Sequence, residues 1–316
     1  NNFTARTLNL YFIDYFFKKY KARTFLKKKS LYIVAIIVVL AYLFGCSSTG
    51  EKSQNVLIAA SIAPLADFAE QIGGSKVEVF TIVPAGTDPH TFELTPGLMK
   101  KLNTTNLMVF NGIGLEYWAE NVKDNLPGSE MVYAADGLKI LSGDEDHHAE
   151  GNPHVWLNPQ NAAYMVIRIQ AALTKVDAEN QKYYQNNAAL FIKELEVLDS
   201  EIKTVVDSWT QKKFVCFHPA WIYFAEHYGL EQAGVIEERH GMQPSPGDVV
   251  DIIKTVNQIG ARVIFAEAQF SSQMAEIIAQ ESDISVVPLD PLGSQGQTSY
   301  VELLRYNVEQ MSKGMK

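Results

Sequence analysis

The residues with the clearest potential for chemistry are four that lie far apart along the chain, each beside a proline. They are three histidines and one aspartate: His90, His154, His218 and Asp290. Neutral imidazole suits Zn²⁺, and four ligands complete the tetrahedron that this ion prefers. A single carboxylate limits the cost of burying a doubly charged ion. Four protein ligands leave no open position for a reactive water molecule, so this set favours binding over hydrolysis.

Three of these residues follow predicted strands. His90, His218 and Asp290 each come after a short apolar segment that is typical of a buried strand. In open α/β sheets, ligands bind beyond the carboxyl ends of the strands. We therefore expect these side chains to lie at the edges of sheets that face one cleft, where the loop that carries His154 can reach them.

Short apolar strands alternate with helices in two stretches of the chain, which predicts parallel sheets with crossover helices. The predicted strands lie at 56–60, 77–83, 107–110 and 131–134, and then at 213–217, 234–236, 262–266 and 285–289. The fold expected is α/β, with two lobes that each contain a four-stranded, mostly parallel sheet flanked by helices.

The segment between the two stretches predicts a helical connection. Residues 178–209 contain neither proline nor glycine, and a helix of that length spans about 48 Å at 1.5 Å per residue. We expect a long, rigid helix within a linker at 159–209. It joins an N-terminal lobe at 55–158 to a C-terminal lobe at 210–316.

Residues 1–45 differ from the rest of the chain in charge and hydropathy. They hold eight basic residues and one acidic residue, and three lysines precede an uncharged apolar run of 15 residues, Leu31 to Gly45. That run is shorter than the ~20 residues of a membrane-spanning helix and fits a signal peptide. Residues 1–45 contain no methionine, so we expect the true translation start to lie within this leader. An uncleaved membrane span is the alternative.

The end of the run, Leu43-Phe44-Gly45-Cys46, resembles a bacterial lipobox. We expect cleavage before Cys46, a lipid on its thiol and a polar tether at 46–54. Such a protein is exported and is anchored to the outer side of a membrane.

The chain from Cys46 onward is strongly acidic. It carries 19 basic and 35 acidic residues, a net charge of −16, which repels phosphate backbones and excludes a nucleic-acid partner. With only two cysteines in the whole sequence, a disulfide framework is also excluded. The sequence has no GxxxxGK[ST] phosphate loop, so any ATP hydrolysis must come from a separate subunit.

Five segments, in order, resemble a known family. They are DPHTFE at 88–93, FNGIGLE at 110–116, NPHVWL at 152–157, FAEAQF at 265–270 and LDPLG at 289–293. Together they are similar to the zinc- and manganese-binding solute receptors of ABC importers, the ZnuA/TroA-like family (cluster A-I). The resemblance runs from about Val56 to Met311.

The resemblance implies a receptor, and not an enzyme, that acts as a monomer. Its ligands carry over as His90, His154, His218 and Asp290, and its partner is an ABC permease in the membrane, served by a separate ATPase. Manganese-preferring members often have a carboxylate where this chain has His218, so three imidazoles favour Zn(II), with Mn(II) as the alternative.

Three further residues are weighed with the ligand set. Glu267 follows a predicted strand, and we expect it to orient a ligand histidine by a hydrogen bond. His147 and His148 lie in an acidic stretch, which is either an accessory loop that collects zinc or an ordinary solvated loop. Two other classes of function stay open: a zinc-dependent hydrolase with Glu267 as its base, and a surface adhesin.

Overall fold

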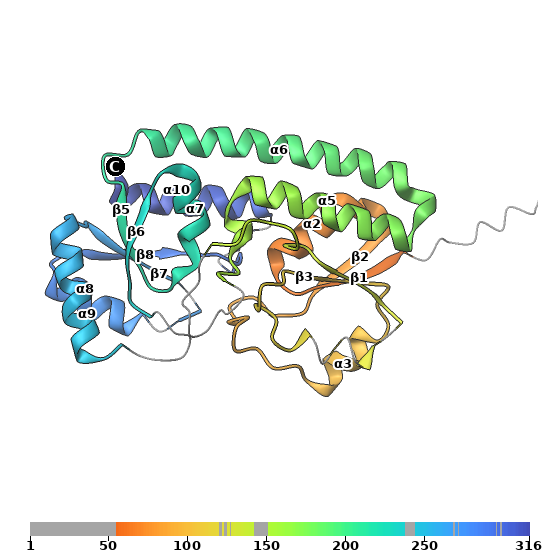
Figure 1. Cartoon of the computed structure of the whole chain (residues 1–316), viewed down its shortest axis with the longest axis horizontal. Helices are drawn as coiled ribbons and strands as arrows, with labels where there is room; N and C mark the ends of the chain where they lie inside the picture. The colour runs from red at the N-terminus through yellow and green to blue at the C-terminus, as the bar shows by residue number, and fades with distance from the viewer. Residues whose placement is uncertain are drawn as a thin grey trace, which may run out of the picture. The chain divides into compact units, whose positions relative to one another are not determined.

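The computed structural model describes residues 55–119, 122, 125–126, 128–141, 151–237, 244–267, 269–270, 272–294, 296–297 and 299–316. The predicted leader at 1–45, Cys46 and the tether lie outside the described residues, as do His147 and His148. Residues Asn55 to Lys316 belong to one compact unit, and the following description concerns that unit (Figure 1).

The first lobe is built on a parallel sheet. Its elements are β1 (Val56–Ala60), α2 (Ala63–Gly73), β2 (Val77–Thr81), α3 (Pro96–Leu102), β3 (Leu107–Phe110) and β4 (Glu130–Tyr133). The strands are ordered β2-β1-β3-β4, and every neighbouring pair is parallel.

The second lobe repeats this topology. Its elements are β5 (Lys213–Cys216), α7 (Ile222–Tyr228), β6 (Glu231–Val235), α8 (Pro246–Ile259), β7 (Val263–Glu267), α9 (Gln273–Glu281), β8 (Ser285–Leu289) and α10 (Tyr300–Met315). The order β6-β5-β7-β8 is again entirely parallel. The predicted two-lobe α/β fold is therefore confirmed.

Two helices connect the sheets. They are α5 (Pro159–Val176) and α6 (Gln181–Asp207), separated by a 3₁₀ turn at Ala178–Asn180. The 27 residues of α6 give a length of about 40 Å, and the helix runs along one side of both lobes (Figure 1). Its buried residues recur every three or four positions, so one continuous stripe faces the core.

The alternating faces of the strands belong to different cores. Ile58 of β1 and Phe265 of β7 lie in a large cluster that also contains the buried faces of α2, α5, α6 and α10. Their neighbours Ala59 and Ile264 point the other way, into separate clusters on the outer faces of the two sheets. Because the large cluster is shared by both lobes, close packing restricts their independent movement.

Contacts of α10 extend beyond the second lobe. The backbone N–H of Tyr300 donates to Asp67 Oδ2 of α2 at 2.8 Å, and the Tyr300 ring packs edge-on against Phe68, with 4.9 Å between centroids. Trp156 Nε1 donates to the carbonyl oxygen of Pro291 at 2.8 Å. These bonds join the lobes close to the loop that carries His154.

The last helix, α10, runs through Gly314 and ends at Met315. Glycine is a poor helix former, but Gly314 lets α10 approach β7, because a Cβ there would lie 2.2 Å from Val263 Cγ2. Tertiary packing therefore extends the helix past a residue that disfavours it. None of the described helices is both long and apolar enough to cross a membrane.

Candidate metal centre

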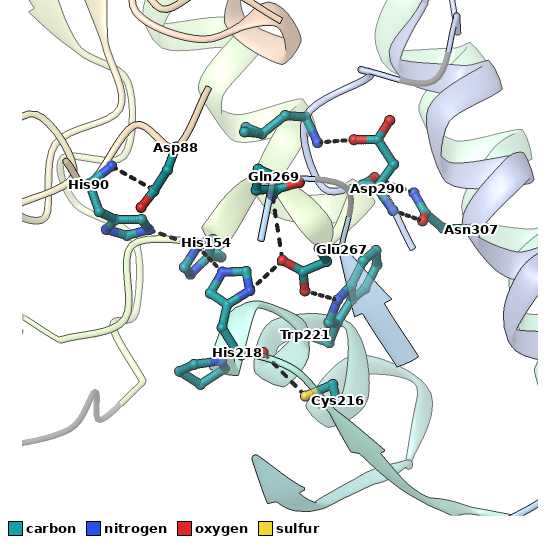
Figure 2. A network of polar contacts seen from close by, with 12 residues as sticks. Asp88, His90, His154, Cys216, His218, Trp221, Glu267, Gln269, Asp290 and Asn307 are labelled. Atoms are coloured by element: carbon teal, nitrogen blue, oxygen red, sulfur yellow. Dashed lines mark hydrogen bonds and ion pairs between the residues drawn. The ribbon is translucent and has the colours of Figure 1, made fainter. Parts of the chain in front are cut away.

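Three histidines from distant parts of the chain converge on one point. His90 lies in the loop after β2, His154 precedes a 3₁₀ turn at Val155–Leu157, and His218 follows β5. One ring nitrogen from each lies within 4.8 Å of the other two. His154 Nε2 is 3.2 Å from His90 Nε2 and 3.1 Å from His218 Nε2 (Figure 2). Among the described residues, this group holds imidazoles only.

These separations fit a single bound ion. Nitrogens bound to one tetrahedral Zn²⁺ at about 2.0–2.1 Å lie roughly 3.3–3.4 Å apart, which is within a few tenths of an ångström of the distances observed. Lone pairs that face one another repel unless a proton or a cation lies between them. One cation at the centre satisfies all three nitrogens together.

The first histidine is held by an aspartate two residues earlier. Asp88 Oδ1 accepts the backbone N–H of His90 at 2.9 Å, and Oδ2 accepts the Thr91 hydroxyl at 3.3 Å. Burial raises the pKa of Asp88, while the bond from His90 and the nearby His218 oppose this rise. A cation in the adjacent cavity, which Asp88 helps to line, stabilises the charged form of this carboxyl.

Asn152 fixes the tautomer of His154. Asn152 Nδ2 donates to the carbonyl oxygen of Pro219 at 2.7 Å, and this contact determines which atom of the amide is oxygen. Asn152 Oδ1 can therefore only accept, and it accepts from the backbone N–H of His154 at 3.0 Å and from its Nδ1 at 2.9 Å. The ring proton lies on Nδ1, which leaves the Nε2 lone pair for a metal.

Glu267 contacts the Nδ1 of His218, as Asn152 contacts the Nδ1 of His154. Its Oε2 contacts His218 Nδ1, while Oε1 accepts the Trp221 Nε1–H at 3.2 Å. His218 follows β5 and Glu267 ends β7, the neighbouring strands at which the strand order of this sheet reverses. Ligands of open α/β sheets bind at such a switch point.

The structure does not bring Asp290 to the three histidines in this conformation. Its Oδ1 accepts the backbone N–H groups of Leu292 at 3.0 Å and Gly293 at 2.9 Å, and its Oδ2 accepts the Ser294 hydroxyl at 3.1 Å. Its own backbone N–H donates to Asn307 Oδ1 at 2.7 Å. The carboxylate holds the turn after β8, so its role as a fourth ligand stays a prediction that requires it to leave these donors.

Comparisons with known proteins identify the family to which the chain belongs. The model of the family described as "Zinc-uptake complex component A periplasmic" (ZnuA) matches residues 58–314. The chain belongs to this family. Two relatives are the high-affinity zinc uptake system protein ZnuA of Bacillus subtilis (strain 168), 25% identical, and the manganese ABC transporter substrate-binding lipoprotein PsaA of Streptococcus pneumoniae, 26% identical. The first alignment covers 92% of this chain and 98% of the relative, and the second covers 91% and 99%.

A solved crystal structure of ZnuA has the same fold. It superposes with a TM-score of 0.76 at 32% identity, over 83% of this chain and 99% of that one. Membership of the ZnuA family thus rests on the sequence and on the three-dimensional arrangement alike.

Within this ZnuA-family chain, sequence reasoning missed two residues that hold the ligand loops, Asp88 and Asn152. Both belong to the same tripeptide pattern, an Asx residue followed by proline and histidine, at 88–90 and 152–154. In both, the Asx oxygen accepts the backbone N–H of the histidine, which is a turn that Asp and Asn favour. The repetition of this pattern was the signal available in the sequence.

Proposed function

We propose that the protein is an extracytoplasmic receptor that captures one Zn²⁺ and delivers it to the permease of an ABC importer. The observation that supports this most directly is the convergence of three imidazoles from different loops: one ring nitrogen of each lies within 4.8 Å of the other two, and His154 Nε2 is 3.2 Å from His90 Nε2 and 3.1 Å from His218 Nε2. Asn152 and Glu267 direct two of these nitrogens inward. Such outer hydrogen bonds orient metal-binding histidines and raise their basicity.

Zinc is proposed over manganese because of the donors. The named relatives of the chain include both zinc and manganese proteins, so family membership alone leaves the metal open. Imidazole suits zinc, while carboxylate, carbonyl and water oxygens suit manganese. The nearby carboxylates of Glu267 and Asp290 are already bonded to other groups, which leaves a nitrogen-rich site.

The place of action follows from the sequence. We propose that residues 1–45 direct export, that Cys46 carries a lipid, and that the tether holds the receptor at the outer side of the membrane. It meets the permease there as a monomer, and the separate ATPase acts on the other side.

Glu267 also bears on the hydrolase alternative. A zinc hydrolase requires a general base within reach of a metal-bound water. Both oxygens of Glu267 are engaged, one with His218 and one with Trp221, so the carboxylate is committed to holding the site. This favours capture and release of the ion over catalysis.

A competition titration tests the choice of metal. The chain from Asn55 onward should prefer zinc to manganese, and His218→Glu should move the ratio of the two affinities toward manganese, because it replaces a nitrogen donor by a carboxylate. The control is His227→Gln, whose ring bonds to Asp199 at 2.7 Å, away from this group. A wild-type protein that prefers manganese, or an unchanged ratio in His218→Glu, contradicts the proposal.

A further inference from the structure

The segment that follows β3 contributes no metal ligand, although it contains most of the FNGIGLE motif at 110–116. The strand ends at Phe110, and residues 111–118 form a series of turns after it. This segment, the β3 brace, contacts the loops that carry two of the three histidines. The two contacts come from its two ends.

The first residue of the β3 brace holds the loop of His154. Asn111 Nδ2 donates to the carbonyl oxygens of Pro153 at 2.9 Å and Gly112 at 3.0 Å. Both acceptors are carbonyl oxygens, so the amide atom that faces them is the nitrogen. Asn111 is fully buried, and Pro153 directly precedes His154. The bond therefore fixes the backbone from which this imidazole extends.

The last two residues of the β3 brace hold the loop of His90. The Tyr117 hydroxyl donates to the carbonyl oxygen of Phe92 at 2.7 Å. The Trp118 ring packs edge-on against the ring of Phe92, with 5.8 Å between the centroids. Phe92 lies two residues after His90, so these contacts restrict the movement of the loop on its other side from Asp88.

Glu116 joins the two ends of the β3 brace. Its Oε1 accepts the backbone N–H of Asn111 at 2.8 Å, and its Oε2 accepts that of Gly112 at 3.0 Å. Hydrogen bonds from backbone N–H groups to a carboxylate are among the stronger ones in proteins. The residue beside Tyr117 thus holds the residue that bonds to Pro153, and the brace acts as one unit.

The β3 brace keeps two features that are unfavourable for stability. Ile113 has a φ of 55°, a left-handed conformation that a β-branched residue rarely adopts. Asn111 Oδ1 is buried and has no hydrogen-bond partner among the residues that the structure describes, which is destabilising. Such features persist only where the surrounding structure enforces them, and they cluster at sites that bind ligands.

We propose that the β3 brace positions His90 and His154 relative to each other, with Tyr117 acting through His90 and Asn111 acting through His154. The inference rests on the proposed function, because the brace takes effect in the capture of zinc. Imidazoles that are already held in place lose less freedom when the ion binds. The brace therefore raises zinc affinity without contacting the ion.

The first test compares Tyr117→Phe with Tyr164→Phe, each in the chain from Asn55 onward. Tyr164 also donates its hydroxyl to a backbone carbonyl oxygen, that of Asp136 at 2.9 Å, in the turn after β4, which carries no metal ligand. A zinc titration should show a loss of about 2- to 10-fold in Tyr117→Phe, the worth of one hydrogen bond, and no loss in Tyr164→Phe. Tyr117 is 55% exposed, so Tyr117→Phe should fold and unfold as Tyr164→Phe does.

A second pair of variants tests the other end of the brace. Asn111→Ser removes the amide that reaches Pro153, and Asn187→Ser removes an amide that donates to the carbonyl oxygen of Ile72 at 3.0 Å, away from the histidines. We expect zinc affinity to fall by roughly 10-fold or more in Asn111→Ser and to stay at the wild-type value in Asn187→Ser.

A His90→Ala background separates positioning from general weakening. His154 and His218 remain there, 3.1 Å apart. Tyr117→Phe should cause no further loss in this background, because it acts through His90, whereas Asn111→Ser should cause its full loss.

Three results overturn the inference and leave the three-histidine site intact. They are wild-type zinc affinity in Tyr117→Phe, wild-type affinity in Asn111→Ser, and an equal loss from Tyr117→Phe with and without His90. If the wild-type protein binds no zinc, the proposed function itself fails.

Discussion

Replacing His154 with alanine is expected to lower the zinc affinity by more than about 100-fold. Losing only the hydrogen-bond partner of a ligand lowers metal affinity by about 10- to 100-fold, and losing the ligand itself should cost more. His154 contacts both of the other histidines: its Nε2 lies 3.2 Å from His90 Nε2 and 3.1 Å from His218 Nε2. Its removal leaves two imidazoles from opposite lobes and no common centre. His90→Ala and His218→Ala should show losses of the same order.

Thermal unfolding provides a second reading of the same loss. Zinc at 100 times its Kd should stabilise the wild-type protein by about 2.7 kcal/mol, because it binds only the folded state. At the same zinc concentration, His154→Ala should gain at most about 0.4 kcal/mol, because its Kd is then no lower than the zinc concentration. His227→Ala serves as the control, since it removes a histidine that bonds to Asp199. Equal zinc affinity in His154→Ala and His227→Ala would refute the site.

Replacing Asn152 should impair binding and stability together. The residue is 1% exposed, and its side chain makes three hydrogen bonds, two to His154 and one across the lobes to Pro219. Asn152→Leu keeps the size but leaves these partners unpaired in the interior. We expect a loss of about 3 kcal/mol in the free energy of unfolding without metal, and of roughly 10- to 100-fold in zinc affinity.

Asn152→Asp separates the two effects. Its carboxylate still accepts the proton on His154 Nδ1, so zinc affinity should stay near that of the wild type. It cannot donate to the Pro219 carbonyl oxygen, so the melting temperature of the metal-free protein should fall. Chemical unfolding measures the stability of both variants, and a zinc titration measures their affinity. Wild-type zinc affinity in Asn152→Leu would contradict the proposal that Asn152 orients His154.

The fold was predictable because strands buried on both faces are continuous apolar runs. Segments such as Val56–Ala60 and Val263–Glu267 stand out on this ground. The convergence of the three histidines was also predictable, since His90 and His218 follow strands of parallel sheets and the ends of such strands meet ligands. Both predictions use local sequence and one rule of topology.

Other features depend on contacts that no local pattern specifies. Tyr300 bonds to Asp67 across 233 positions of the chain, and Asn152 bonds to Pro219 across 67. The carboxylate of Asp290 can serve either its own turn or an ion, and the sequence contains both possibilities. Only the structure shows that in this conformation the turn holds it.

X-ray absorption at the zinc edge, on the zinc-loaded chain from Asn55 onward, tests most directly whether three imidazoles share one ion. The spectrum should show three imidazole nitrogens and one oxygen at about 2.0–2.1 Å, with the outer scattering of the imidazole rings. The spectrum of each single histidine variant should show one imidazole fewer than that of the wild type. A shell with fewer than three imidazoles in the wild type, or one of six mainly oxygen ligands, would contradict the account.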